Sequence, residues 1–403
     1  MSSSPDRSTP EPDLKHAVAL VTKMMAIPGP SGREAKILAF ITQELRKAGV
    51  PGSAIRTDRV HQRSPYGGEV GNLIVRLPAS KGIRAPRRLL VAHVDTVPIC
   101  EGCRPVRRKG WVRSTDRTRG LGADNRSGAA AVLTAALTVF GKKLPHPPLT
   151  LFFPVQEEVG LVGARHVSLS DLGHPKLGFN FDGGSSSKLT IGATGAYRLE
   201  IRIRGRASHA GVAPKDGISA ITIAGLAIAR LKRGGWLGEI RKRSHRGTSN
   251  IGSIHAGAAT NVVPDEALLR AEVRSHEPGF RKAILDAFCH EFQNAASAVR
   301  NRAGDQGAVR VEHHLDYEAF KLTRREPCVA EAAATVRALG AEPVFSVANG
   351  GLDANWLSQR GVPTVTFGAG QHNAHTVNEM LNLDEFTSAC RIALRLATAQ
   401  VHS

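Results

Sequence analysis

The sequence predicts an α/β protein: a layered α/β domain into which a second, α+β domain is inserted. Two features lead to this expectation. Short apolar runs alternate with helical segments as far as Gly195 and again after Phe320, whereas the stretch between them alternates apolar and charged residues, as strands with one solvent-exposed face do. A chain of 403 residues is also too long for one ordinary core, so two domains are expected.

The first domain is expected to open with two helices. One runs from Leu14 to Met25. The other follows a Pro-Gly-Pro turn, where Ser31 and Glu34 have the spacing of a capping box, and Gly49 ends it. Apolar runs then predict buried strands, and Ala-rich runs predict helices. The strands are Leu89–Ala92, Leu149–Val155, Leu177–Phe181 and Thr364–Phe367, and the helices include Ser127–Phe140 and Leu383–Ala397.

The inserted domain is expected to have the order βαββαβ of the ferredoxin-like split unit. Its first strand begins at Tyr197, and every second residue from there to Arg204 is charged. Its other elements are a helix at Gly217–Leu231, strands at Thr248–Ile254 and Ala267–Val273, a helix at Phe280–Val299 and a strand at Val309–His313. The predicted bounds are 13–194 with 316–403 for the first domain and 195–315 for the inserted one, after a disordered tail at 1–12.

Composition and charge narrow the possible partners. The net charge of +19 would suit a polyanionic partner. The basic runs Arg104–Arg119 and Leu231–Arg246 contain no aromatic ladder or phosphate clamp, however, so a nucleic acid is not expected. No apolar run is long enough to cross a bilayer, and five scattered cysteines, with Cys100 and Cys103 as one Cys-x-x-Cys, suit a reducing compartment. We therefore expect a cytoplasmic protein without a membrane partner.

Two adjacent glutamates, Glu157 and Glu158, follow a buried apolar run. Like charges at that place repel each other and add nothing to a core. Because successive residues at a strand end point to opposite sides, Glu158 can bind a metal ion while Glu157 faces a bound water as a general base. Ion pairs with local arginines are the alternative interpretation.

Further candidate ligands stand at the ends of other predicted strands. His93 and Asp95 are two residues apart, so both side chains leave the same face, and the carboxylate can accept the second N–H of a metal-binding imidazole. A polar strand terminus is the plainer interpretation of that pair. Asp182 ends a strand in Phe-Asn-Phe-Asp-Gly-Gly, and His375 lies in a polar loop in which His372 competes with it.

Asp124 lies in Gly-Ala-Asp-Asn, just before a predicted helix. It can either cap that helix or protrude from the turn as a ligand that bridges two cations, and its position favours both equally. In the company of the other residues, the ligand set is that of a paired zinc, cobalt or manganese site. The set is His93, Asp124, Glu158, Asp182 and His375.

These motifs occur in an order that resembles the zinc peptidases and deacylases grouped with peptidase T, glutamate carboxypeptidase and aminoacylase. The resemblance implies a three-layer α/β/α catalytic domain with a mixed sheet, and an inserted lid and dimerisation domain. It also implies two divalent metal ions, zinc by preference and cobalt or manganese as substitutes. Asp124 would bridge them, with His93 and Asp182 completing one site and Glu158 and His375 the other.

The same resemblance assigns roles to residues that bind no metal. Glu157 would take the proton of the attacking water, and Asp95 would support His93. In the inserted domain, the histidine of Ser-His-Ala-Gly, His209, would reach a neighbouring subunit's active site and stabilise the oxyanion, which implies a homodimer. Asn261 and Arg274 match positions that hold substrate groups in relatives; without the resemblance they are a turn residue and an edge-strand charge.

Within the superfamily, the chain most resembles the tripeptide aminopeptidases of the peptidase T branch. Glu-Glu-Val-Gly-Leu and Gly-Gly-Leu-Asp-Ala-Asn carry this likeness, and Gly351 in the second segment is assigned to substrate binding. Asn125, where that branch has a second acidic residue, and Leu161 depart from its pattern. The alternatives are a deacylase, carboxypeptidase or dipeptidase acting on N-acyl amino acids or dipeptides, and a non-catalytic anion-binding protein with the same fold.

Overall fold

The computed structural model describes residues 10–398, so most of the predicted tail at 1–12 lies outside the described residues. The chain forms two compact units. The large unit contains the chain up to Gly192, Lys321–Ala348 and the chain from Leu352 onward. The small unit contains Ala193–Phe320 and Asn349–Gly351. Within residues 10–398, no helix combines the length and apolar character needed to span a bilayer.

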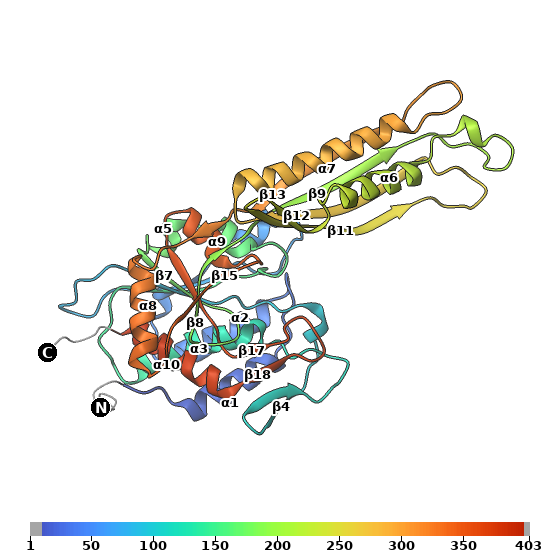
Figure 1. The fold of residues 1–403 in the computed structure, drawn as a ribbon. Helices are drawn as coiled ribbons and strands as arrows, with labels where there is room; N and C mark the ends of the chain where they lie inside the picture. The colour runs from blue at the N-terminus through green and yellow to red at the C-terminus, as the bar shows by residue number, and fades with distance from the viewer. Residues whose placement is uncertain (1–9, 399–403) are drawn as a thin grey trace. The chain divides into compact units, whose positions relative to one another are not determined.

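A nine-stranded mixed sheet forms the centre of the large unit (Figure 1). Its four inner strands run parallel: β6 (Leu149–Phe153), β3 (Arg88–Val91), β7 (Leu177–Phe181) and β16 (Thr364–Phe367). β2 (Leu73–Leu77) and β8 (Lys188–Ala193) flank them in antiparallel orientation. β1 (Ile55–Thr57) pairs with β2, and β14 (Phe320–Lys321) and β15 (Val344–Ala348) pair with β8. The mixed sheet predicted by the resemblance is confirmed.

Helices cover both faces of this sheet, because its buried strands send apolar side chains alternately to either side. Leu90 and Leu151 pack on one face in the main core, whereas Val91 and Phe152 pack on the other. Burying each such side chain contributes about 1.5–3 kcal/mol. The first face is covered by α1 (Leu14–Ala26), α2 (Ala35–Lys47), α3 (Ala123–Gly141), α8 (Pro327–Ala338) and α10 (Leu383–Ala397), and the second by α4 (Val162–His166), α5 (Leu169–Leu172) and α9 (Asp353–Gln359).

The start of α2 differs from the predicted capping box. The helix begins at Ala35 without a side-chain cap. The Ser31 hydroxyl instead donates to Asp95 Oδ2 at 2.7 Å, and Glu34 Oε1 accepts the backbone N–H groups of Gly32 and Gln156. The prediction was wrong because Ser31 turns to Asp95 and Glu34 turns to the backbone of Gln156, and both partners are buried and lie far away in the sequence. The predicted helix end is confirmed, since Gly49 has φ +91°.

A small antiparallel sheet, which the sequence did not predict, is attached to the large unit. Its order is β17 (Gln371–His372), β18 (Met380–Asn382), β5 (Trp111–Ser114) and β4 (Pro105–Arg108). Val112 and Leu381 are opposite each other and buried, so one face of this sheet joins the core. The sheet thereby holds the loop between β17 and β18 in place.

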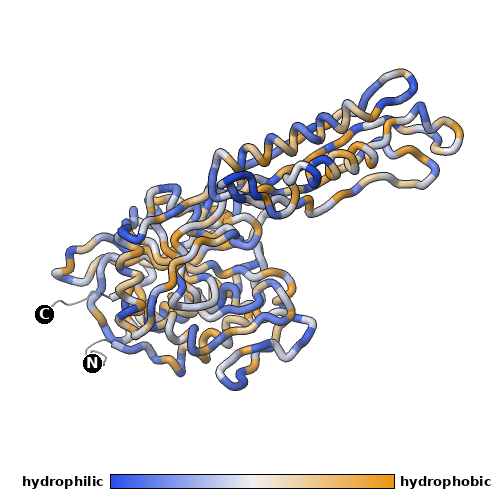
Figure 2. The backbone as a smooth tube through the Cα atoms, viewed as in Figure 1, coloured by the Kyte–Doolittle hydropathy of each residue, from blue (hydrophilic) through white to orange (hydrophobic). Residues whose placement is uncertain are grey.

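The small unit is a five-stranded antiparallel sheet with two helices on one face. Its strands, in spatial order, are β10 (Gly238–Lys242), β11 (His245–Ala256), β12 (Glu266–Ser275), β9 (Gly195–Arg204) and β13 (Ala308–Tyr317), and its helices are α6 (Ala220–Arg233) and α7 (Pro278–Ala298). Ile201 and Phe288 belong to the core between sheet and helices. The alternation of apolar and polar residues can be followed along the strands in Figure 2. Strand β10 is an addition to the predicted order: it forms a hairpin with β11 at the sheet edge.

Candidate active site

The parallel strands bring chemically active side chains to one edge of the large sheet. His93 and Asp95 follow β3, Glu157 and Glu158 follow β6, and Asp182 follows β7. The carboxyl ends of parallel strands lie at the same edge, which is where functional groups of α/β folds collect. Five of the residues singled out from the sequence therefore meet although they are up to 89 positions apart.

Asp124 lies between the two candidate histidines. Its Oδ1 is 3.3 Å from His93 Nε2, and its Oδ2 is 3.3 Å from His375 Nε2. His375 Nε2 is also 2.9 Å from Glu158 Oε2, while His93 Nε2 is 3.9 Å from Asp182 Oδ2. Two groups of residues each offer potential ligand atoms that lie within 4.8 Å of one another. One group is His93, Asp124 and Glu158, and the other is His93, Glu157 and Asp182. A carboxylate whose two oxygens each face a different imidazole has the arrangement that a ligand bridging two metal ions requires.

The backbone at Asp124 explains why this carboxylate protrudes. Asp124 and Asn125 have non-helical backbone angles within the first turn of α3. Asn125 is fixed in this turn, because its Nδ2 donates to the Phe181 carbonyl and its Oδ1 accepts from Gly128 N–H. Gly122 offers α3 no side-chain cap, and after the kink the side chain that accepts a helix N–H is that of Asn125, not Asp124. The interpretation of Asp124 as a helix cap is therefore wrong.

Two residues that hold this geometry were missed by the sequence analysis. Glu379 is buried and accepts the backbone N–H groups of Leu121, Gly122 and Asp124 at 2.7–2.9 Å. Gln371 Nε2 donates to Asp182 Oδ1 at 2.9 Å. Both flank His375 on β17, β18 and the loop between them, where no periodic pattern reveals which side chains turn inward. The only sequence signal was that Glu379 lies close to the segment that contains His375.

Asp95 organises both glutamates as well as His93. Its Oδ1 lies 3.3 Å from His93 Nδ1 and accepts the N–H of Glu157 at 3.0 Å. Its Oδ2 accepts from the N–H of Glu158 and from Ser31. The carboxylate thus ties the end of β3 to the end of β6.

The electrostatics of the cluster suit a cation. Burial, with repulsion between like charges, raises the pKa of Glu158 to about 7 and that of Asp182 to about 6. Burial also raises the pKa of Glu157 well above its usual range. Asp124 Oδ1 is buried and has no hydrogen-bond partner. Buried acidic groups whose basic neighbours are histidines alone are costly unless a metal ion or protons neutralise them, so the nitrogen and oxygen donors present fit a divalent metal pair.

Asp353, in Gly-Gly-Leu-Asp-Ala-Asn, is a further buried acid that the sequence analysis did not single out. It begins α9, and both of its carboxylate oxygens lack a hydrogen-bond partner. Burial, followed by the influence of neighbouring charges, raises its pKa to about 8. α9 leads back to the start of β16, so its first residue lies toward the carboxyl edge of the sheet.

The other sequence-predicted residues lie in the small unit. His209 is exposed, and its Nδ1 accepts the N–H groups of Gly211 and Val212. It lies beside Asn261, whose carbonyl accepts the N–H of Ala210 at 2.9 Å. Arg274 pairs with Glu272.

Gly351 is the last of these residues. A Cβ there would lie 2.6 Å from the ring of Tyr317, so any other residue would require that ring to shift. Among the small-unit residues predicted from the sequence, the structure places His209 and Asn261 side by side.

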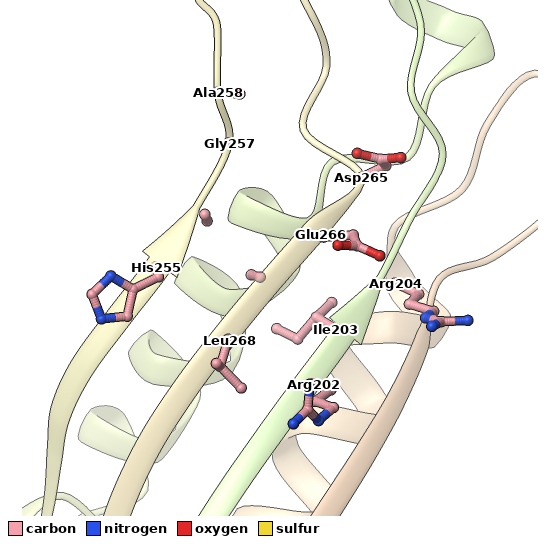
Figure 3. A pocket seen from close by; sticks show the side chains of 11 residues that line it. Arg202, Ile203, Arg204, His255, Gly257, Ala258, Asp265, Glu266 and Leu268 are labelled. Atoms are coloured by element: carbon pink, nitrogen blue, oxygen red, sulfur yellow. The ribbon is translucent and has the colours of Figure 1, made fainter.

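A surface hollow of about 400 Å³ in the small unit contains none of these residues (Figure 3). It is lined by β9, β11 and β12, with arginines, acids and an imidazole among the side chains. Arg202 is ion-paired with Glu200 beside it. Mixed charges of this kind describe a solvated surface and not a catalytic pocket.

Comparison with known proteins identifies the family. Residues 89–399 match the model of Peptidase family M20/M25/M40. The chain belongs to this peptidase family. It is 30% identical over 375 residues to the protein named uncharacterized protein YqjE of Bacillus subtilis, covering 93% of this chain and 95% of that one.

Two solved structures share the fold of this M20-family chain closely. A tripeptidase from Staphylococcus aureus superposes with a TM-score of 0.85 at 28% identity, covering 96% of this chain and 98% of that one. The aminopeptidase PepT from Bacillus cereus gives a TM-score of 0.82 at 30% identity with the same coverage. The predicted kinship with peptidase T is confirmed, and the chain is a peptide hydrolase of the M20 family.

Proposed function

We propose that this M20 peptidase is a two-metal aminopeptidase that releases the N-terminal residue of short peptides, tripeptides in particular. The observation that carries the proposal is the position of Asp124, whose two oxygens each lie 3.3 Å from a different histidine. The names of the two similar structures, a tripeptidase and an aminopeptidase, support the substrate class.

Five residues would hold the metal ions, with zinc proposed and cobalt or manganese as possible replacements. Asp124 would bridge the pair, His93 and Asp182 would complete one site, and Glu158 and His375 the other. A bound pair of this kind lowers the pKa of a shared water and polarises the substrate carbonyl. Gln371 and Glu379 would keep Asp182 and the Asp124 turn in position.

Glu157 would be the proton carrier. Its backbone N–H is held by Asp95, and burial raises its pKa well above that of an ordinary glutamate, which favours the return of the proton to the leaving group. It would take a proton from the attacking water and deliver it to the nitrogen of the leaving amine. Asp95 would be a positioning residue, because it holds His93 and the backbone N–H groups of both glutamates.

His209 would contribute from a second subunit, with the small unit acting as lid and dimerisation domain. Because its Nδ1 accepts two backbone N–H groups, the neutral ring carries its proton on Nε2. That N–H is a donor suited to the oxyanion of the reaction. Asn261, Arg274 and Gly351 would contact the substrate, and we propose a cytoplasmic location for the enzyme.

A peptide panel tests this function. The protein, loaded separately with zinc, cobalt or manganese, is incubated with free tripeptides, the same peptides N-acetylated, N-acyl amino acids and dipeptides. We expect cleavage of the free tripeptides and loss of at least about 10²-fold in rate on blocking, since the ammonium group would be recognised. Preference for N-acyl amino acids or dipeptides would show a deacylase, carboxypeptidase or dipeptidase, and absence of bound metal would favour an anion-binding protein.

A further inference from the structure

The basic segment Arg104–Arg119 has no part in the function described so far. It contains seven basic residues and one acid, Asp116, and it includes β4 and β5. All seven basic side chains are exposed, and within residues 10–398 none of them forms an ion pair. We call this segment the basic hairpin.

The basic hairpin is attached to the strands that carry the active-site loop. Arg113 on β5 is directly opposite Met380 on β18, and the ring of Trp111 lies 5.3 Å from that of His372 on β17. His375 lies in the loop between these two strands. The end of the hairpin approaches the same loop, since a Cβ on Gly120 would lie 3.1 Å from the carbonyl oxygen of Thr376, the residue after His375.

The orientation of the small antiparallel sheet leaves two of these cations beside the loop. Val112 is on the buried face, so Arg113 and Trp111 are on the opposite, solvent-facing side. Arg119 immediately precedes Gly120. Adjacent strands are about 4.8 Å apart and charges are screened over about 8 Å at physiological ionic strength. We therefore expect Arg113, one strand from Met380, and Arg119, next to Gly120, to act on the loop.

From this arrangement we infer that the enzyme is selective for short peptides with acidic side chains, which the basic hairpin attracts to the active site. The inference rests on the proposed peptidase function and specifies its substrate class. Guanidinium groups that form no ion pair can bind carboxylates in a bidentate manner. An electrostatic field of one sign beside a site also raises the association rate of oppositely charged ligands by about 10- to 10³-fold.

The test compares Ala-Glu-Glu, Ala-Gln-Gln and Ala-Lys-Lys as substrates of the metal-loaded protein. We expect kcat/KM to fall in that order, with an acidic-to-neutral ratio of about 10 at low salt that declines toward 1 at 0.5 M salt. Arg113→Glu with Arg119→Glu should lower this ratio at least about fivefold, and the Gln pair at the same positions should lower it less. Folding of each variant is checked by its thermal unfolding.

A matched control is Lys142→Glu with Lys143→Glu, which makes the same change in charge. These lysines follow the last turn of α3, roughly 25 Å along the helix from Asp124. The control should leave the ratio unchanged. Binding of Ala-Glu-Glu to the Glu157→Gln protein, measured by calorimetry, should weaken with the Arg113 and Arg119 changes even where nothing is hydrolysed.

The outcomes separate the two proposals. No cleavage of any tripeptide would overturn the peptidase function, whereas cleavage of acidic and neutral peptides at equal rates in all salts would overturn the selectivity alone. An equal fall in the ratio for the lysine control would also overturn it. If single-stranded DNA binds through Arg113 and Arg119 while the ratio does not respond to them, the hairpin serves a nucleic acid and the inference is wrong.

Discussion

The sheet of the small unit and the active-site edge of the large unit are both rich in charged residues, but they differ in how these residues are paired. On the small unit's solvent face, charges of opposite sign pair across strands: Arg198 lies 2.6 Å from Glu272, and Arg270 lies 3.7 Å from Glu200. At the active-site edge, the described chain places no arginine or lysine within ion-pair distance of Glu157 or Asp182. Among the basic side chains described, His93 alone lies within 4 Å of these two acids.

This difference shows how a functional cluster can be told from a structural one. Exposed pairs lose little solvation and contribute about 0.2–1 kcal/mol each. Buried acids without cations lose much more, and they persist only where a ligand or protons neutralise them. The unneutralised acids therefore mark the site, while the many arginines of the small unit's sheet do not.

The largest expected effect is at Glu157. Glu157→Gln keeps a side chain of the same size but cannot carry a proton, so kcat should fall at least about 10²-fold. Metal content, measured on the purified protein, should stay unchanged. Glu200→Gln on the small unit's sheet is the control and should retain activity; equal turnover in the two variants would remove Glu157 from the mechanism.

A smaller effect is expected at Glu379, which is not among the proposed metal ligands. Glu379→Gln replaces one acceptor oxygen facing the N–H groups of the Asp124 turn. Zinc affinity, measured by competition with a chelator, should weaken about 10- to 10²-fold, the usual scale for groups that orient ligands. Glu331→Gln, which disturbs an ion pair with Arg88, should leave zinc affinity unchanged. Equal affinities in both variants would contradict a positioning role.

A pH-dependent effect is expected at Glu34, another buried acid of the large unit. Burial, followed by the charge of Asp95, raises its pKa from 4.5 to about 7. The folded protein therefore keeps this proton to a higher pH than the unfolded chain, and stability falls as pH rises from about 4.5 to about 7.

Glu34→Gln removes this titration but keeps an acceptor for the N–H groups of Gly32 and Gln156. Relative to the unsubstituted protein, the variant should gain about 2 kcal/mol of unfolding free energy between pH 5 and pH 8. Urea unfolding with a chelator present measures this difference. Glu44→Gln, on the same helix, should show no such gain, and parallel pH profiles for all three proteins would disprove the assignment.

The smallest effect is expected on the small unit's sheet. Arg270 is exposed, and its Nε lies 3.7 Å from Glu200. Arg270→Gln should change the free energy of unfolding by less than about 0.5 kcal/mol and leave zinc affinity unaltered. A loss above about 1.5 kcal/mol would show that the charge pairs of this sheet contribute more to the free energy of unfolding than exposed pairs usually do.

The sequence by itself determined which residues could do chemistry and the kind of element on which each stands. The apolar runs before His93, Glu157 and Asp182 are local signals of buried strands, and a polar residue at the end of such a run is visible without any knowledge of the fold. The alternation beginning at Tyr197 likewise indicated the half-exposed sheet of the small unit. These inferences succeeded because side-chain period and residue type are properties of short segments.

Only the tertiary structure decided how those residues are held. Ser31 supports Asp95 across 64 positions, and Glu379 supports the Asp124 turn across more than 250. The local pattern around Ser31 predicted a cap, and nothing near Glu379 predicted its partners. Such contacts depend on strand order and on which loops meet at the sheet edge, and strand order is set by packing of the whole unit. A buried polar group takes the best partner that the complete fold offers, wherever that partner lies in the sequence.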